Sequence, residues 1–181
     1  MKRLLACAGF LAASLFAVAQ QNPPASPAEQ ASSSIGGHNI SISYSAPSVK
    51  GREGKIFNQG GLIQSTHKQY PIWRAGANAA TTLTTDSTLQ LGNISVPAGK
   101  YTLFVEISNP DSWILIVSKQ TGEWGLRYDP TQDLGRTKMQ MSKPPQMVEL
   151  LKWSVNGTAG NHGTLTLAWE NYAASVPLDV Q

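Results

Sequence analysis

The chain has 181 residues, of which 41% are hydrophobic and 14% are charged. This length fits a single domain, and so few charges beside so many apolar residues exclude an intrinsically disordered chain. The formal net charge is +3, but Lys2 and Arg3 lie in a predicted export signal, and their removal leaves 12 basic residues against 11 acidic ones. A mature chain of net charge +1 gives no reason to expect a nucleic acid or an anionic membrane as partner.

The first 19 residues have the pattern of a secretory signal peptide. A basic start precedes an almost wholly apolar run over residues 4–18, and Ala17-Val18-Ala19 is a small-x-small site for signal peptidase. The apolar run is shorter than the roughly 18 residues of a membrane span, so a retained anchor is the less favoured alternative. We therefore predict cleavage after Ala19, export to the periplasm or the medium, and no transmembrane segment in the mature chain.

The single cysteine, Cys7, lies inside the predicted signal peptide. Residues 4–7, Leu-Leu-Ala-Cys, resemble a lipobox, but six preceding residues are too few for a basic region and a membrane-inserting core. A lipoprotein is therefore the less favoured alternative. A mature chain without thiols cannot use disulfides, cysteine-ligated zinc or a cysteine nucleophile, so its stability must come from packing.

Residues 20–34, QQNPPASPAEQASSS, show no apolar periodicity, and we predict a flexible leader here and a single domain over residues 35–181. From residue 35 onward, apolar and polar residues alternate with period two between turn residues, which is typical of strands. About nine or ten short strands and no amphipathic helix predict an all-β fold, an antiparallel β-sandwich or jelly roll. The predicted strands cover residues 40–44, 81–85, 89–91, 94–96, 101–107, 113–117, 136–141, 149–155, 165–169 and 176–180.

The stretch over residues 70–85, YPIWRAGANAATTLTT, is chemically the most unusual part of the chain. Arg74 offers a rigid fork of donors for a carboxylate or phosphate. The small residues after it let a backbone or a ligand approach closely. Among them Gly76 permits a backbone conformation that other residues avoid, and Asn78 adds an amide. We predict that this stretch forms part of a binding site.

Two further loops are expected to join that site. Residues 48–61 carry three cations among four glycines, which suits an anion, although a solvated basic loop is the alternative. Residues 121–134 depart from the strand pattern and concentrate aromatic and charged side chains, and loops on a rigid scaffold often carry function. The candidate ligand-binding residues are Arg74, Asn78, Lys50, Arg52, Trp124, Arg127 and Tyr128.

Known catalytic and metal-binding patterns are missing from the chain. His38, His67 and His162 lie far apart without metal-ligand spacing, and we interpret each as a surface or loop histidine. No Gly-x-Ser-x-Gly elbow is present. Asp129 and Asp133 could pair as acid and base or bind calcium, but the calcium-loop pattern is absent. We expect no catalytic residue, no metal and no cofactor.

Four segments of the chain form an ordered series of motifs. They are YSAPSVKGR (residues 44–52), WRAGANAAT (residues 73–81), PAGKYTLF (residues 97–104), and Trp124-Gly125 followed by Tyr128, Asp129 and Asp133. This series resembles a bacterial exported family, the domain of unknown function 2911, over essentially residues 35–180; the family usually has threonine where Ala75 stands. The resemblance implies an exported or periplasmic β-rich domain, and it implies no reaction or ligand.

The residues favour a non-catalytic binding or envelope-associated module for a small polar ligand, a sugar or a carboxylate-bearing molecule. Aromatic rings supply apolar area and arginine supplies direction. The first alternative is a hydrolase acting on envelope material, with Asp129 or Asp133 and one of the cations. The second is a protein-protein interaction module that uses an exposed strand edge or apolar patch.

Arg74 itself has a competing structural interpretation. Trp73 would then pack in the core, and Asp129 or backbone carbonyls would bind the guanidinium group in a buried polar network. The arrangement of the three loops discriminates between the two interpretations. Loops that meet at one end of the sandwich favour a site, and dispersed loops favour a scaffold role.

Overall fold

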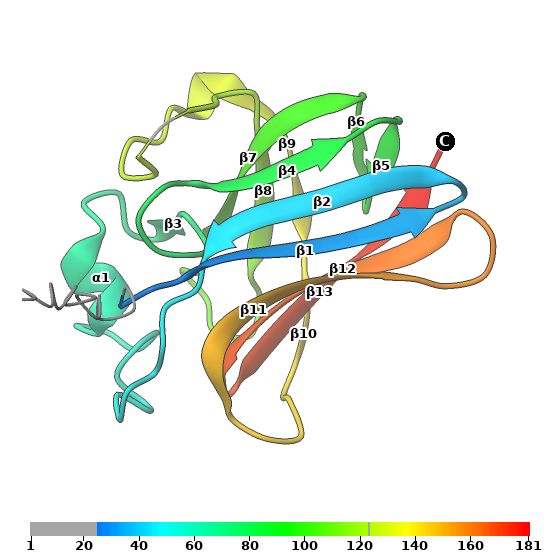
Figure 1. Ribbon diagram of the computed structural model, residues 1–181. Helices are drawn as coiled ribbons and strands as arrows, with labels where there is room; N and C mark the ends of the chain where they lie inside the picture. Colours follow the sequence, from blue (N-terminus) through cyan, green and yellow to red (C-terminus); the bar gives the residue numbers. More distant parts are fainter. Residues whose placement is uncertain (1–24, 123) are drawn as a thin grey trace, which may run out of the picture.

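The computed structural model describes residues 25–122 and 124–181. The predicted signal peptide over residues 1–19, with Cys7, and the first residues of the predicted leader lie outside the described part of the chain. Two antiparallel sheets pack face to face, which confirms the predicted all-β sandwich (Figure 1). Within the described ranges, no helix is long and apolar enough to cross a membrane.

The first sheet has seven strands and the second has six. The order in the first sheet is β1-β2-β4-β7-β8-β9, with β3 paired to β7. Its strands are β1 (Ala28–Ile35), β2 (His38–Ser45), β3 (Ile72–Trp73), β4 (Thr81–Thr85), β7 (Gly99–Glu106), β8 (Ile114–Ser118) and β9 (Asp133–Lys138). The order in the second sheet is β11-β12-β13-β5-β6, with β10 paired to β13. Its strands are β5 (Leu89–Leu91), β6 (Ile94–Val96), β10 (Gln140–Ser142), β11 (Val148–Gly157), β12 (His162–Glu170) and β13 (Tyr172–Val180).

The segment predicted as one strand over residues 136–141 is divided between the two sheets. Lys138 pairs with Ile114 in the first sheet, whereas Gln140 pairs with Ser175 in the second. Between them Met139 is buried, and its N–H donates to the carbonyl of Trp113. The period-two pattern continues through this crossing because both sheets bury the same core, so the pattern does not reveal the change of sheet.

The flexible leader predicted over residues 20–34 is wrong from residue 28 onward, because these residues form β1. This strand pairs with β2 in unbroken register, from Ala28 opposite Ser45 to Ile35 opposite His38. Most of its side chains are exposed, so an edge strand forms here through backbone hydrogen bonds without apolar alternation. A two-residue turn of glycines with positive φ joins the strands, as hairpins of this type require.

Buried aromatic rings fill one end of the core. Trp73 is fully buried, as the structural interpretation of its neighbour predicts. The ring of Phe57 packs among those of Trp73, Trp113 and Trp169, with centroid distances of 5.6, 5.0 and 5.7 Å. Large buried rings of this kind stabilise a fold by several kcal/mol each, about 3–5 by truncation to alanine. Arg74 therefore follows directly on an anchored residue.

The long connection between β2 and β4 covers the end of the sandwich that is drawn on the left in Figure 1. It contains the short helix α1 (Leu62–Thr66) and the strand β3, and the loop between β8 and β9 lies above it in the same view. That second loop includes a single turn of 3-10 helix (Pro130–Gln132). The elements that carry the predicted site residues are therefore gathered at this end.

Candidate functional site

A cavity of about 260 Å³ lies beneath the connection between β2 and β4. We call it the Arg74 cavity and define it by six of its lining residues, Lys50, Arg52, Thr66, His67, Arg74 and Trp169. The described residues that line it include no aspartate and no glutamate. A concave site with several cations and no acid favours an anionic ligand.

Buried hydrogen bonds hold the loop after Arg74 in an unusual backbone conformation. Ala75 has φ 52° and Asn78 has φ 55°, a region that non-glycine residues rarely adopt. The Ala75 carbonyl accepts one hydrogen bond from Thr81 Oγ1 at 3.0 Å and another from Trp153 Nε1 at 2.9 Å. Both bonds are in the interior, where losing a partner is costly, so they offset the strain and fix the loop to the core.

Gly76 is needed for close approach, and its backbone does not use the positive φ that glycine permits. The positive φ values lie at Ala75 and Asn78 instead. A Cβ atom on Gly76 would be 2.9 Å from Thr81 Oγ1 and 3.1 Å from the carbonyl oxygen of Ser45. The missing side chain lets the end of β2 pack directly against the loop.

Arg74 is half-buried, and only part of its guanidinium group is satisfied. Nη1 donates to the carbonyl oxygen of Asn78 at 3.0 Å and to that of Trp124 at 3.4 Å. Nε is buried and has no hydrogen-bond partner among the described residues. Burial lowers the pKa of Arg74 from its usual value, but an arginine side chain keeps its charge at neutral pH. Arg74 lines the cavity and thus has a charged side chain with one N–H group unpaired among the described residues.

Gly125 makes room for the stem of this arginine. It has φ 78°, and a Cβ atom at this position would lie 2.7 Å from Cδ of Arg74 and 3.1 Å from the backbone of Ala80. The loop between β8 and β9 therefore covers one side of Arg74 through glycine backbone, while the Trp124 carbonyl accepts one of its hydrogens. Of the two kinds of partner that the structural interpretation offers for Arg74, the backbone carbonyls are found and Asp129 has no part in the arrangement.

His67 is the functional candidate that sequence reasoning missed. Its side chain is buried, with the residue 6% exposed, so it is not a surface histidine, although it lies in a loop, directly after α1. Nδ1 lies 3.1 Å from the carbonyl oxygen of Ile63 and 3.0 Å from Thr66 Oγ1. Nε2 is buried without a partner among the described residues. Burial, and then the charge of Arg74, lower the pKa of His67 to about 4, so the ring is neutral at neutral pH.

Two cations of the loop over residues 48–61, Lys50 and Arg52, line the cavity, and hydrogen bonds restrain their side chains to different extents. Lys50 is exposed, and its backbone N–H donates to Glu149. Arg52 donates from Nε to the Val49 carbonyl at 3.0 Å and from Nη2 to the Ser48 carbonyl at 2.7 Å. Arg52 is thus partly occupied in closing its own turn, whereas no side-chain hydrogen bond restrains Lys50 within the described chain.

The remaining predicted site residues lie outside the cavity. Asn78 positions Arg74 through its carbonyl, and its side chain reaches the Ser26 carbonyl at 3.5 Å. Trp124 is 62% exposed, and Arg127 is also exposed. The loops that carry these residues meet the Arg74 loop, but of the seven predicted residues only Lys50, Arg52 and Arg74 line the cavity.

Tyr128 belongs to a separate polar network. Its hydroxyl donates to Asp133 Oδ2 at 2.7 Å and accepts a short hydrogen bond from Arg136 Nη2. Burial, followed by the neighbouring Asp133 carboxylate, raises the pKa of Tyr128 to about 12. Asp129 instead caps the 3-10 turn through Thr131, and neither aspartate lines the Arg74 cavity.

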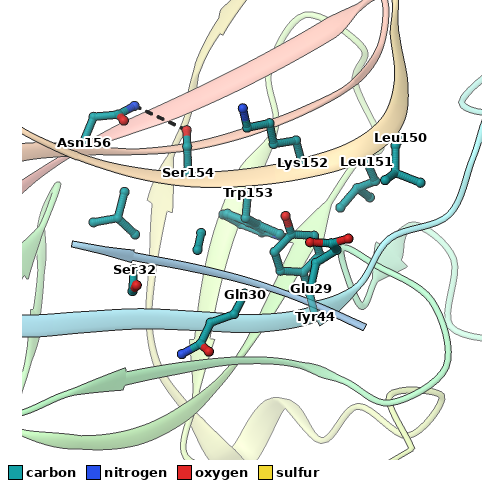
Figure 2. A pocket seen from close by; sticks show the side chains of 12 residues that line it. Glu29, Gln30, Ser32, Tyr44, Leu150, Leu151, Lys152, Trp153, Ser154 and Asn156 are labelled. Carbon is teal, nitrogen blue, oxygen red and sulfur yellow. Dashed lines mark hydrogen bonds between the residues drawn. The ribbon is translucent and has the colours of Figure 1, made fainter. Parts of the chain in front are cut away.

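A larger hollow of about 550 Å³ runs between β1 and β11, the edge strands of the two sheets. Figure 2 shows Glu29 of β1 and Tyr44 of β2 beside Trp153 of β11, and Asn156 donates to Ser154 Oγ at 3.3 Å. None of its described lining residues has a buried polar atom without a partner. This hollow therefore shows no buried polar side-chain atom without a partner among its described lining residues, in contrast to the Arg74 cavity.

Fold and site together define an antiparallel β-sandwich with a cationic cavity at one end. The family model described as Protein of unknown function (DUF2911) matches residues 26–178, which extends from just before β1 to near the end of β13. The chain belongs to this family. No curated protein and no solved structure matches the chain.

Proposed function

We propose that this protein is an exported, non-catalytic binding module that holds a small carboxylate-bearing ligand in the Arg74 cavity. One observation carries the proposal: two residues that line the cavity, Arg74 and His67, each have a buried side-chain nitrogen, Nε and Nε2, without a partner among the described residues. A buried polar group left unpaired costs about 1–3 kcal/mol. A bound molecule that pairs with both atoms recovers that cost.

The charges around the cavity support an anion. Lys50, Arg52 and Arg74 line it, and no aspartate or glutamate is among its described lining residues. Hydrogen bonds between an arginine and a carboxylate are stronger than neutral ones. The size supports a small molecule, because ligand pockets usually measure about 300–1,000 Å³ and this one holds about 260 Å³. A short carboxylic acid, or the acid end of a sugar acid, fits these limits.

The alternatives have less support from the geometry. A hydrolase would need an acid or base within reach of a bound substrate, and neither Asp129 nor Asp133 lines the cavity. An interaction module would need an unpaired strand edge or an apolar patch. The hollow between the edge strands β1 and β11 (Figure 2) offers strand edges, but no observation identifies a partner for it.

Calorimetric titration of the mature chain tests the proposed binding. Acetate, propionate, lactate and glucuronate are the carboxylate probes, and glucose is the uncharged probe. We expect one or more carboxylates to bind and glucose not to bind. Arg74→Gln should weaken binding about tenfold or more, since it removes a charged hydrogen bond. The matched control is Arg127→Gln, an exposed arginine outside the cavity, which should bind like the wild type. Equal losses in both variants, or no carboxylate binding, would contradict the proposal.

Export is tested separately from binding. Cell fractionation should recover the protein outside the cytoplasm, and sequencing of its N-terminus should begin at Gln20 if cleavage follows Ala19. A cytoplasmic protein that still begins at Met1 would contradict export and leave the binding proposal to stand on its own measurement.

A further inference from the structure

We infer that His67 is a specificity-determining residue, which selects carboxylates that carry a hydroxyl group beside the acid, such as 2-hydroxy acids and sugar acids. This inference rests on the proposed function of the Arg74 cavity. A site that binds any anion requires only a hydrogen-bond acceptor on the ligand. The site inferred here requires a hydrogen-bond donor on the ligand as well.

The surroundings of His67 decide which ring nitrogen carries the proton. Nδ1 faces the carbonyl oxygen of Ile63 at 3.1 Å, and a carbonyl oxygen can only accept. The other neighbour of Nδ1, Thr66 Oγ1, donates its own hydrogen to the Leu62 carbonyl at 2.7 Å, so we assign the proton of the ring to Nδ1. Since the pKa of the ring is lowered to about 4, the second proton is absent at neutral pH. Nε2 consequently carries a lone pair and acts as an acceptor.

The unpaired atoms of the residues that line the cavity are of opposite kinds. Arg74 Nε and Trp169 Nε1 are donors, whereas His67 Nε2 is an acceptor, and all three are buried without partners among the described residues. A simple carboxylate satisfies a donor and leaves the acceptor unpaired. A carboxylate with an adjacent hydroxyl satisfies both kinds, because its oxygen atoms accept from Arg74 and its hydroxyl hydrogen is donated to His67.

The expected selectivity follows from the cost of an unpaired group. A site built to pair with a ligand hydroxyl discriminates against an analogue that lacks it, because a buried protein atom is then left without a partner. A net hydrogen bond of ordinary strength corresponds to about threefold to tenfold in affinity. We therefore expect lactate to bind about threefold to tenfold more tightly than propionate, which has the same carbon skeleton without the hydroxyl.

Two variants of His67 separate the acceptor from the ring. The amide nitrogen of asparagine can occupy the place of Nδ1, so His67→Asn keeps the bond to Ile63 and loses the acceptor at Nε2. The longer side chain of glutamine can place an amide oxygen near Nε2, so His67→Gln keeps an acceptor there. We expect His67→Gln to retain the preference for lactate, and His67→Asn to reduce the ratio of the two affinities to about one while still binding propionate.

Each outcome of this calorimetric comparison has one meaning. If neither acid binds the wild type, the proposed function itself fails. Equal binding of lactate and propionate to the wild type overturns this inference alone. A preference for lactate that persists in His67→Asn, or that disappears in both variants, also overturns this inference. Either result shows that the acceptor at Nε2 does not bind the hydroxyl group of the ligand. Inorganic phosphate is the remaining probe, because hydrogen phosphate also combines an oxyanion with a hydroxyl. Tighter binding of phosphate than of lactate would overturn the assignment to carboxylic acids.

A measurement on the wild type keeps the inference testable if a variant fails to fold. Heteronuclear NMR distinguishes the two nitrogens of a neutral imidazole ring. We expect His67 to show a protonated Nδ1, and we expect its Nε2 resonance to move on addition of lactate and to move much less with propionate. A protonated Nε2 in the free protein would overturn the inference directly.

Discussion

Replacing His67 by asparagine should remove a large pH-dependent component of stability. The ring is buried at the end of α1, and the charged groups that line the cavity with it, Lys50, Arg52 and Arg74, are all cations. Burial and the positive charge of Arg74 lower the pKa of His67 from 6.5 to about 4 in the folded protein. The unfolded chain therefore binds a proton at His67 at a higher pH than the folded chain does.

The direction and size of the effect follow from this difference. Between pH 6.5 and about pH 4 the unfolded state is protonated at His67 and the folded state is not, so acidification favours unfolding. The stabilisation by the neutral ring is complete above pH 6.5 and is lost as the pH falls toward the folded pKa. At about 1.4 kcal/mol per pH unit, the loss over this range is about 3 kcal/mol.

Urea denaturation of the wild type and of His67→Asn at several pH values measures this loss. The groups common to both proteins contribute equally, so the difference between the two free energies of unfolding reports His67 alone. We expect the wild type to lose about 3 kcal/mol relative to the variant between about pH 7 and about pH 4. A difference that stays constant over this range would show that His67 titrates as a solvated histidine, and the reasoning about a buried neutral acceptor would then be wrong.

Two further substitutions test how the loops are held. Gly125→Ala should lower the free energy of unfolding by about 1–3 kcal/mol, since the new Cβ meets Arg74 Cδ at 2.7 Å. Gly122 has the same φ of 78° and nothing within 4 Å of a Cβ, so Gly122→Ala controls for backbone strain and should lower the free energy of unfolding by less. Trp153→Phe should be about 1 kcal/mol more destabilising than Trp73→Phe, because only the indole of Trp153 donates a hydrogen bond within the described structure. Urea denaturation measures both pairs, and equal effects within a pair would contradict the corresponding contact.

The sheet architecture was accessible from the sequence because it depends on a local pattern. Strands such as β11 and β12 bury alternate side chains against one core, and that alternation is visible in the residues themselves. The strand β1 was not accessible in this way, since its side chains are mostly exposed and its stability comes from backbone pairing with β2. The Gly36-Gly37 pair before His38 was the available signal for that hairpin.

The candidate site was only partly predictable, for a related reason. Arg74 and its small neighbours are unusual in composition, and charge alone draws attention to Lys50 and Arg52. His67 has no such local signature, because its burial depends on how α1 packs against the loop of Arg74. The hydrogen bonds of Tyr128 were not predictable for the same reason, since its partners Asp133 and Arg136 are brought to it by the fold.

The two interpretations of Arg74 turn out to describe different atoms of one side chain. Its Nη1 is bound by the carbonyls of Asn78 and Trp124, as a structural arginine would be. Its Nε remains buried and unpaired beside a cavity, as a binding residue would be. The carbonyl bonds orient the guanidinium group, and orientation before binding lowers the entropic cost of holding a ligand.

The most direct test of the central claim is to observe Arg74 Nε–H while a carboxylate is added. Heteronuclear NMR resolves the Nε–H groups of arginines, and the signal that is missing in Arg74→Gln identifies this one. We predict that titration with lactate shifts the Arg74 signal saturably, and that the signal of the exposed Arg127 does not follow it. An Arg74 signal that stays unchanged up to high concentrations of lactate, glucuronate and propionate would contradict the claim that this cavity is a binding site for carboxylates.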